Sequence, residues 1–315
     1  EIVDESGIFL GINLQNAGFV ILDRWKYENP HLTILARSGS GKSYTTKLEV
    51  MRNLMMGTDV LILDPENEYQ SIAELYSGSF IGLSLKQDTV LNPFDLPPVL
   101  PTEDPLDIYK EHVSDLISLC QLIMNEKLSP EDLAILDQAI NQTYESFNIL
   151  PTQDFSKTER FPTLNDLEKI LNGLTGGNKL ASRLYPYTQG NFSGFINKPT
   201  SVELNKRLIV FGLKDLPETL RPIGMFLVLN YILNRVRREM KRRLVIIDES
   251  WWIMKQEFGA EFLLNAVKRG RKYGLAITTI TQDVEDFLSS PYGKPIITNS
   301  AITFLMKQSP ATINL

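Results

Sequence analysis

The stretch Ala36-Arg37-Ser38-Gly39-Ser40-Gly41-Lys42-Ser43 decides the fold, because it nearly matches the phosphate-binding loop pattern G-x-x-x-x-G-K-[ST]. Small residues let such a loop wrap closely, so that its N–H groups and the N-terminus of a following helix face a phosphate. In this pattern the Lys contacts the β- and γ-phosphates and the hydroxyl holds Mg²⁺, roles that we expect of Lys42 and Ser43. The predicted nucleotide contacts are Arg37, Ser38, Gly39, Ser40, Gly41, Lys42, Ser43 and Tyr44.

Position 36 departs from the pattern, since it is Ala where the pattern has Gly. Ala resists a positive φ, so the sequence leaves open how strongly this loop binds a nucleotide. The alternative interpretation is a chance Gly/Ser turn before a helix. The flanks favour the functional interpretation, because residues 32–36 are typical of a strand and residues 43–56 carry apolar side chains at helical spacing before Gly57.

Short apolar runs recur along the whole chain. Several are nearly continuous in Val, Ile and Leu, which is typical of parallel strands buried on both faces. Helical patterns alternate with these runs, including a long one over 217–240, so we predict an α/β fold with helices on both faces of a sheet. The runs are Gly7–Ile12, Phe19–Leu22, Leu32–Ala36, Val60–Asp64, Leu208–Phe211, Leu244–Asp248, Leu275–Ile280 and Ala301–Met306.

One block, from about residue 97 to 200, lacks a convincing buried strand and shows helix start signals instead. Ser129 is followed by Pro130 and two acids, which is a favourable helix N-terminus. Thr163, with Asp166 three residues later, repeats the capping pattern. We therefore predict an all-helical insert at 98–200 between two parts of one α/β core, at 1–97 and 201–315.

An apolar run over 243–247 ends in Asp248 and Glu249. Ligands bind at the carboxyl ends of parallel strands. Asp248 is therefore expected to hold Mg²⁺, directly or through water, and Glu249 to orient and polarise an attacking water. A full acid pair beside a phosphate-binding loop indicates hydrolysis rather than storage of a nucleotide. The acids of Asp64–Tyr69 end another strand, and the sequence leaves open whether they serve the metal environment, serve a subunit contact or form an ordinary turn.

Two further polar groups are candidates for the same chemistry. Gln282 follows the run Leu275–Ile280 and could contact the γ-phosphate or the water, although Thr281 or Asp283 could instead cap a helix there. Arg269 and Arg271 end a predicted helix. They either stabilise that helix end or act as an arginine finger, in cis or from a neighbouring subunit. Trp251 and Trp252 are interpreted as core and interface packing rather than as chemistry.

Composition excludes several classes of protein. The 315 residues carry a net charge of −6 and a single cysteine, Cys120. An acidic chain of this kind does not coat nucleic acid, although a local basic groove remains compatible with it. One Cys and two His exclude a disulfide framework and a Cys/His zinc site. No apolar run approaches the ~20 residues of a membrane helix. Because the chain opens at Glu1, we expect a fragment of something longer.

The chain resembles the C-terminal ATPase domain of VirB-four/TraC-type proteins of type IV secretion and conjugation, within the HerA–FtsK group of RecA-like motors. The resemblance spans nearly the whole sequence. The phosphate-binding loop and the Asp-Glu pair are generic, whereas other stretches narrow the family. These stretches are Asp64-Pro65-Glu66-Asn67-Glu68-Tyr69, Asn92-Pro93-Phe94 and Asp248-Glu249-Ser250-Trp251. The same ordered set includes Pro162–Leu167, Arg269–Gly274 and Thr281-Gln282.

The resemblance implies a RecA-like core that hydrolyses ATP with Mg²⁺ to power channel or pilus assembly and substrate transfer. Lys42, Ser43, Asp248, Glu249 and Gln282 would take the roles given above, and Arg269 or Arg271 would stabilise charge. The implied partners are a coupling protein, a second secretion ATPase, inner-membrane channel proteins and further copies of the chain, in a hexamer when assembled. Nucleic acid is a possible partner but not a required one.

The resemblance also implies a location at the cytoplasmic side of a bacterial membrane, reached through a missing N-terminal domain or through partners. Two other functions stay open. One is a DNA-pumping translocase or coupling protein of the HerA–FtsK group, which a steep salt-dependent DNA affinity would support. The other is a nucleotide-gated scaffold with negligible turnover.

Overall fold

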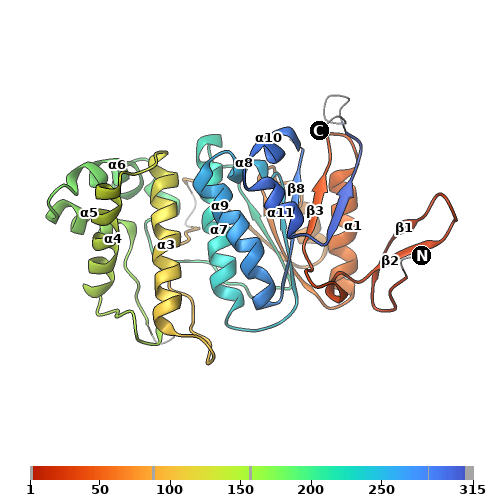
Figure 1. Cartoon of the computed structure of the whole chain (residues 1–315), viewed down its shortest axis with the longest axis horizontal. Helices are drawn as coiled ribbons and strands as arrows, with labels where there is room; N and C mark the ends of the chain where they lie inside the picture. Colours follow the sequence, from red (N-terminus) through yellow and green to blue (C-terminus); the bar gives the residue numbers. More distant parts are fainter. Residues whose placement is uncertain (1–2, 87–88, 156–157, 283, 309–315) are drawn as a thin grey trace.

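The core of the protein is a parallel sheet of seven strands (Figure 1). The structure, a computed structural model, describes residues 3–86, 89–155, 158–282 and 284–308. Every neighbouring pair of strands in this sheet runs parallel. The sheet has the order β5 (Ser79–Gly82), β6 (Leu208–Gly212), β4 (Asp59–Asp64), β7 (Arg243–Ile247), β8 (Leu275–Thr281), β3 (Leu32–Leu35) and β9 (Ile302–Leu305). The prediction of an α/β fold is confirmed.

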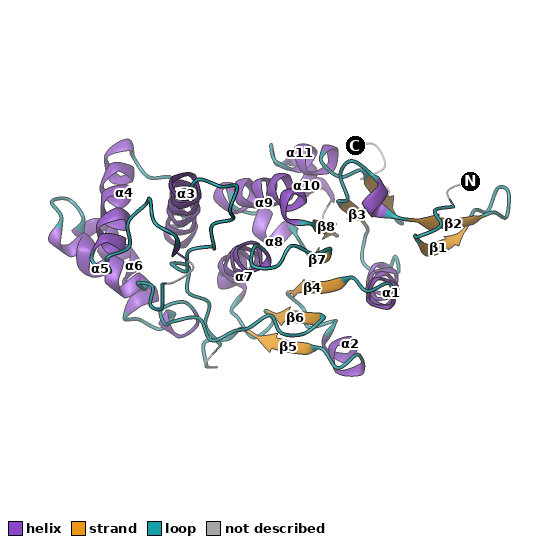
Figure 2. Cartoon of the chain, turned by 90° about the horizontal axis from the view of Figure 1, so that it is seen from below, coloured by secondary structure: helices purple, strands orange, loops and turns teal. Residues whose placement is uncertain are grey.

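Helices cover both faces of the sheet, which explains why every residue of its central strands is buried and most are apolar (Figure 2). Successive side chains of a strand point to opposite faces. Val60 and Ile62 of β4 pack with α1 (Lys42–Met55) and α2 (Gln70–Leu75) on one face. Leu61 and Leu63 pack on the other face, in a hydrophobic cluster shared with α7 (Arg221–Val236) and α9 (Glu257–Gly270). The remaining helices of that side are α8 (Trp251–Met254), α10 (Val284–Ser289) and α11 (Gly293–Thr298).

Four helices lie beyond α7 and α9, at the far end of the molecule from β3 and α1 (Figure 1). They are α3 (Pro105–Met124), α4 (Pro130–Glu145), α5 (Leu164–Gly173) and α6 (Asn178–Thr188). The predicted helix starts are present, since Ser129 caps α4 and Thr163 forms a capping box with Asp166 in α5. The described residues between 98 and 200 form no strand. One continuous hydrophobic cluster joins these helices to α7, α9 and the sheet, so the predicted division into three segments stays a prediction.

Two predicted strands lie outside the sheet, contrary to the expectation of buried parallel strands. β1 (Ile8–Ile12) and β2 (Phe19–Leu22) pair antiparallel in a separate ribbon that projects beside α1 (Figure 1). Phe9, Ile12 and Phe19 are exposed there, because no helix among the described residues covers the outer side of the ribbon.

Two further differences concern an edge strand and a helix. β5 was not predicted, since its four residues are only half-buried at the edge of the sheet. The helix expected over 217–240 is shorter, because Glu218–Leu220 form a 3-10 turn and α7 covers Arg221–Val236.

None of the helices in the described part of the chain combines the length and the apolar character needed to cross a bilayer.

Candidate functional site

The phosphate-binding loop connects β3 to α1 at the carboxyl edge of the sheet. Gly39 and Gly41 have φ of +73° and +90°, a region that L side chains avoid, so the two glycines make the loop possible. α1 begins at Lys42, and its first free N–H groups and helix dipole favour an anion at the loop. The buried Ser40 hydroxyl has no hydrogen-bond partner in the described structure. A loop with free donors around it fits a phosphate group.

The departure at position 36 does not distort the loop. Ala36 is fully buried, and its N–H donates to the Thr281 carbonyl at 3.1 Å. Its φ is not positive, since the described non-glycine residues with positive φ do not include it. The loop places its left-handed conformations at Gly39 and Gly41 instead, so Ala is compatible with the geometry at position 36.

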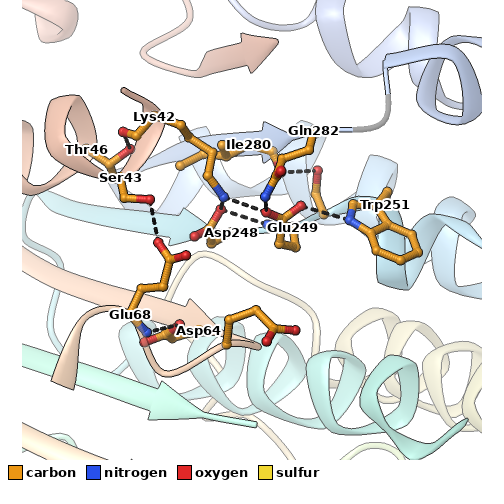
Figure 3. A network of polar contacts seen from close by, with 12 residues as sticks. Lys42, Ser43, Thr46, Asp64, Glu68, Asp248, Glu249, Trp251, Ile280 and Gln282 are labelled. Atoms are coloured by element: carbon orange, nitrogen blue, oxygen red, sulfur yellow. Dashed lines mark hydrogen bonds and ion pairs between the residues drawn. The ribbon is translucent and has the colours of Figure 1, made fainter. Parts of the chain in front are cut away.

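Lys42 lies between the two acids that follow β7 (Figure 3). Its Nζ lies 2.8 Å from Asp248 Oδ1 and 2.5 Å from Glu249 Oε1. All three side chains are buried. Burial alone would lower the pKa of Lys42, but the two carboxylates outweigh this effect and raise it. Lys42 and Asp248 are 206 residues apart in the sequence. The fold thus brings the predicted lysine and the predicted acid pair together beside the loop.

Glu249 is held in an unusual conformation. Its φ is +47°, which for a residue other than Gly costs on the order of 1 kcal/mol and often marks a functional site. Gln282 Nε2 donates to Glu249 Oε1, and Trp251 Nε1 donates to Oε2 at 2.8 Å. Glu249 and Gln282 line a cavity of about 520 Å³ that also reaches Arg37 and Ser38 of the loop. The carboxylate is therefore fixed beside a space that is continuous with the loop.

The acids that end β4 also meet the loop. Ser43 Oγ donates to Glu68 Oε2 (Figure 3). Asp64 accepts the N–H groups of Glu68 and Tyr69, at 3.0 and 2.8 Å, which fixes the turn. Burial raises the pKa of Asp64 to about 6, although these N–H groups oppose the shift. The sequence left two interpretations open for this segment. The structure places Glu68 at Ser43, which is the predicted metal-binding hydroxyl.

The side chains beside the loop include the two residues expected to hold Mg²⁺. Within the described residues, no group of three or more His, Cys, Asp or Glu side chains could hold a metal ion alone. Mg²⁺ is usually bound by one or two protein ligands together with waters and substrate phosphates. Ser43, in the first turn of α1, and Asp248, directly after β7, fit that sparse kind of site.

Several predicted site residues lie elsewhere. Arg269 ends α9, and its guanidinium contacts Glu111 at 2.6 Å and Asp115 at 3.2 Å on α3. Arg271 pairs with Glu28 at 3.4 Å. Both arginines precede β8 and so lie at the amino edge of the sheet. The seven residues of β8, at roughly 3.3 Å each, put that edge about 20 Å from the loop. A finger in cis does not fit this arrangement, and a finger in trans stays a prediction.

Two other expectations concern Tyr44 and the turn after β8. Tyr44 is 70% exposed on α1, and its contact with a nucleotide stays a prediction. Gln282 contacts Glu249, which supports the functional interpretation over a simple helix cap. Asp283, the alternative cap, lies outside the described residues.

Sequence reasoning missed the role of Trp251, which was interpreted as packing. Its indole stacks on Trp252, as expected, with 4.3 Å between ring centroids. Its N–H, however, binds the predicted catalytic carboxylate. The available signal was a Trp two residues after Glu249, in the turn that follows a strand.

Three features lie together at one edge of the parallel sheet: the phosphate-binding loop, the acid pair after β7 and the polar residue Gln282 after β8. This combination defines a P-loop nucleoside triphosphatase. Comparison with known families gives the narrower assignment. The family model of the TraG P-loop domain matches residues 20–312, and the chain belongs to this family.

Known proteins resemble the chain over most of its length. The structure of VirB4 of Thermoanaerobacter pseudethanolicus is 27% identical and superposes with a TM-score of 0.87, covering 99% of this chain and 87% of that one. The plasmid coupling protein TrwB in complex with ADP and Mg²⁺ is 15% identical, with a TM-score of 0.52 over 85% of this chain and 68% of that one. The VirB4 match confirms the resemblance to VirB-four proteins, and TrwB shares the fold.

A curated relative is the DNA import protein CedB of Sulfolobus acidocaldarius. It is 22% identical over 288 residues, which are 89% of this chain. The chain spans 45% of the length of that relative.

Proposed function

We propose that the chain is the Mg²⁺-dependent ATPase of a type IV secretion or conjugation machine. The observation that carries this proposal is the buried cluster of Lys42, Asp248, Glu249 and Gln282 beside a phosphate-binding loop. The TraG family and the VirB4 similarity support the kind of machine. Two other TrwB structures hold non-hydrolysable analogues of ATP and of GTP, which supports a nucleoside triphosphate as the ligand. The choice of ATP rests on the family.

Each residue of the cluster has a distinct chemical task. The loop N–H groups and Lys42 would bind phosphates, which compete with the two carboxylates for the lysine. Ser43 and Asp248 would hold Mg²⁺, which neutralises phosphate charge when it is bound. Glu249 would orient the attacking water and accept its proton. Gln282 fixes the Glu249 carboxylate through its amide.

The place in the machine is inferred from the family. The chain would act at the cytoplasmic side of a bacterial membrane, with channel proteins, a coupling protein and a second ATPase as partners. A homo-oligomer, in the form of a hexamer, would let an arginine of one subunit reach the nucleotide of the next. Arg271 suits this role better than Arg269, because it is 56% exposed and pairs only with an exposed Glu28 among the described residues.

Turnover across a protein-concentration series tests the proposal. Lys42→Ala and Glu249→Gln should each abolish Mg²⁺-dependent ATP hydrolysis. Glu249→Gln should still bind ATP, since its loop is intact. Lys268→Ala and Glu261→Gln are matched controls, because both side chains are exposed on α9. Turnover that rises more than linearly with concentration supports a site completed between subunits. Tight ATP binding with no turnover at any concentration, unchanged by Glu249→Gln, would favour a nucleotide-gated scaffold.

DNA translocation is a second candidate function, because the curated relative is a DNA import protein. The net charge of −6 does not favour a nucleic-acid surface over the whole chain. Stimulation of turnover by DNA, with an affinity that falls steeply as salt rises, would establish this function. ATP turnover that does not change when DNA is added at low salt would favour the secretion ATPase over a DNA translocase.

A further inference from the structure

The turn between β7 and α8 brings the side chain of Trp251 back to Glu249. The Ser250 N–H and hydroxyl both donate to the Ile280 carbonyl, at 2.8 and 3.0 Å, and fix this turn to β8. The Trp252 N–H donates to the Glu249 carbonyl at 3.0 Å. Glu249 takes the left-handed φ of +47° within the turn. The backbone thus places residues 249 and 251 on one side, with their side chains in contact (Figure 3).

The two oxygens of the Glu249 carboxylate have different partners. Oε1 accepts from Lys42 and Gln282, whereas Oε2 accepts from Trp251 Nε1 at 2.8 Å. Lys42 is the residue expected to turn to phosphate when a nucleotide binds. Gln282 and Trp251 would then be the neutral donors that keep the carboxylate in its orientation, one on each oxygen.

Trp251 is itself held firmly. Its ring stacks on the buried Trp252, at 4.3 Å and an interplanar angle of 24°. Lys255 Nζ lies over both rings, 4.3 Å from the Trp251 centroid and 4.0 Å from that of Trp252. Arg221 lies over the Trp252 ring at 5.2 Å and binds Glu66 at 2.7 Å. An indole packed in this way loses little freedom when it holds its partner, which is the requirement for a preorganised site.

Trp251 lines two cavities. One is the cavity of about 520 Å³ that Glu249 also lines, and the other is a cavity of about 590 Å³ lined with Met254, Lys255 and Tyr292. The indole therefore has contacts both with the Glu249 carboxylate and with Trp252 of α8. From its contacts on both sides, we propose that Trp251 is a positioning residue that orients the Glu249 carboxylate for hydrolysis. This inference rests on the proposed ATPase function.

Steady-state kinetics of Trp251→Phe tests the inference, because Phe keeps an aromatic ring and removes the N–H. We expect kcat to fall on the order of 10- to 100-fold, which corresponds to one hydrogen bond to a charged group lost in the transition state. KM and the affinity for a non-hydrolysable ATP analogue should change less than about twofold, since Glu249 does not bind the phosphates. Trp25→Phe is the matched control, since the Trp25 ring contacts Arg242 and does not line the cavity of Glu249, and it should keep kcat within about threefold.

A second substitution separates positioning from packing. Replacing Trp251 with the isostere β-(3-benzothienyl)alanine changes only the N–H to sulfur, so it should lower kcat as much as Phe does. Recovery of the parent kcat by this isostere would overturn the inference, because the ring alone would then suffice. An unchanged kcat in Trp251→Phe would overturn it as well. Absence of turnover in the parent protein is a different result, and it would remove the proposed function itself.

Discussion

Replacing Arg269 by Met should loosen the attachment of α3 to α9. The Arg269 guanidinium contacts Glu111 at 2.6 Å and Asp115 at 3.2 Å, and its side chain is 23% exposed. Burial raises the pKa of Asp115 to about 6, against the opposing attraction of Arg269. Met keeps the apolar part of the side chain but leaves the largely buried Asp115 carboxylate, 16% exposed, without its cation.

The magnitude lies between two limits. Breaking a fully buried pair costs about 3–5 kcal/mol, and an exposed pair is worth about 0.2–1 kcal/mol. Partial burial of Arg269 places the expected loss at about 2 kcal/mol in the free energy of unfolding, measured by urea denaturation. Asp115→Asn in the same chain should recover much of this loss, because it removes the unpaired charge.

The loss should also depend on pH in a defined direction. A carboxyl with a folded pKa above its unfolded value takes up a proton on folding, so stability falls as pH rises from about 4 to 6 in the parent. Without the cation this pKa rises further, so Arg269→Met should be more destabilising at pH 8 than at pH 5. A loss below about 0.5 kcal/mol at both pH values, with ATP turnover abolished, would refute the reasoning and assign Arg269 to nucleotide chemistry.

Three further predictions concern single residues. Arg271→Gln should change the free energy of unfolding by less than about 0.5 kcal/mol, because its pair is exposed, yet lower the turnover of the assembled protein by about 10³-fold or more; unchanged turnover would exclude it as a finger in trans. Ala36→Gly should leave ATP affinity within about twofold, measured by calorimetry, and cost about 0.5–1 kcal/mol of stability, since Ala36 is buried without positive φ; a tenfold gain in affinity would contradict this. Burial lowers the pKa of His112 to about 3, so stability is lost as pH falls below about 6.5, and His112→Phe should flatten this slope in urea titrations by about 1.4 kcal/mol per pH unit; an unchanged slope would assign it to other groups.

The sequence predicted the central sheet well, because burial on both faces leaves a local record. β4, β6 and β7 have continuous apolar interiors, and β8 is buried at every position although three of its residues are Thr. The strand-loop-helix pattern around Lys42 likewise identified the phosphate-binding loop. Parallel strands end at the same edge of a sheet, so the sequence alone places the acid pair and Gln282 near the loop.

The edge strand β5 and the ribbon of β1 and β2 are harder to predict from the local sequence. β5 has four half-buried residues, and its pairing with β6 joins residues about 130 apart. β1 and β2 are apolar enough to suggest buried strands, but burial requires a covering layer that local sequence does not specify. The described part of the chain places no helix over the outer side of this ribbon (Figure 1).

Long-range side-chain contacts were the least predictable part of the site. Arg269 contacts Asp115 and Glu111, which precede it by 154 and 158 positions in the sequence. Its local sequence is therefore equally compatible with an arginine finger and with a structural ion pair to α3. Trp251 differs, since its partner is only two residues away. Aromatic pairs are usually packing, and what gives Trp251 a second role is the left-handed φ of Glu249, which turns the carboxylate towards the indole.

Trp251 and Arg269 together allow a test of whether the position of the helices α3 to α6 affects the geometry of the site. Trp251 begins α8 and Arg269 lies at the end of α9, so one continuous segment joins the Glu249 turn to the contact with α3. The two side chains lie at opposite edges of the sheet, and their effects on the free energy of unfolding should add within about 0.5 kcal/mol in the double variant Trp251→Phe/Arg269→Met. The two fold-changes in kcat should likewise multiply if α8 and α9 move independently of one another's contacts. A double variant whose kcat differs more than about fivefold from the product of the two single effects would show that position of the helical block and orientation of Glu249 are coupled.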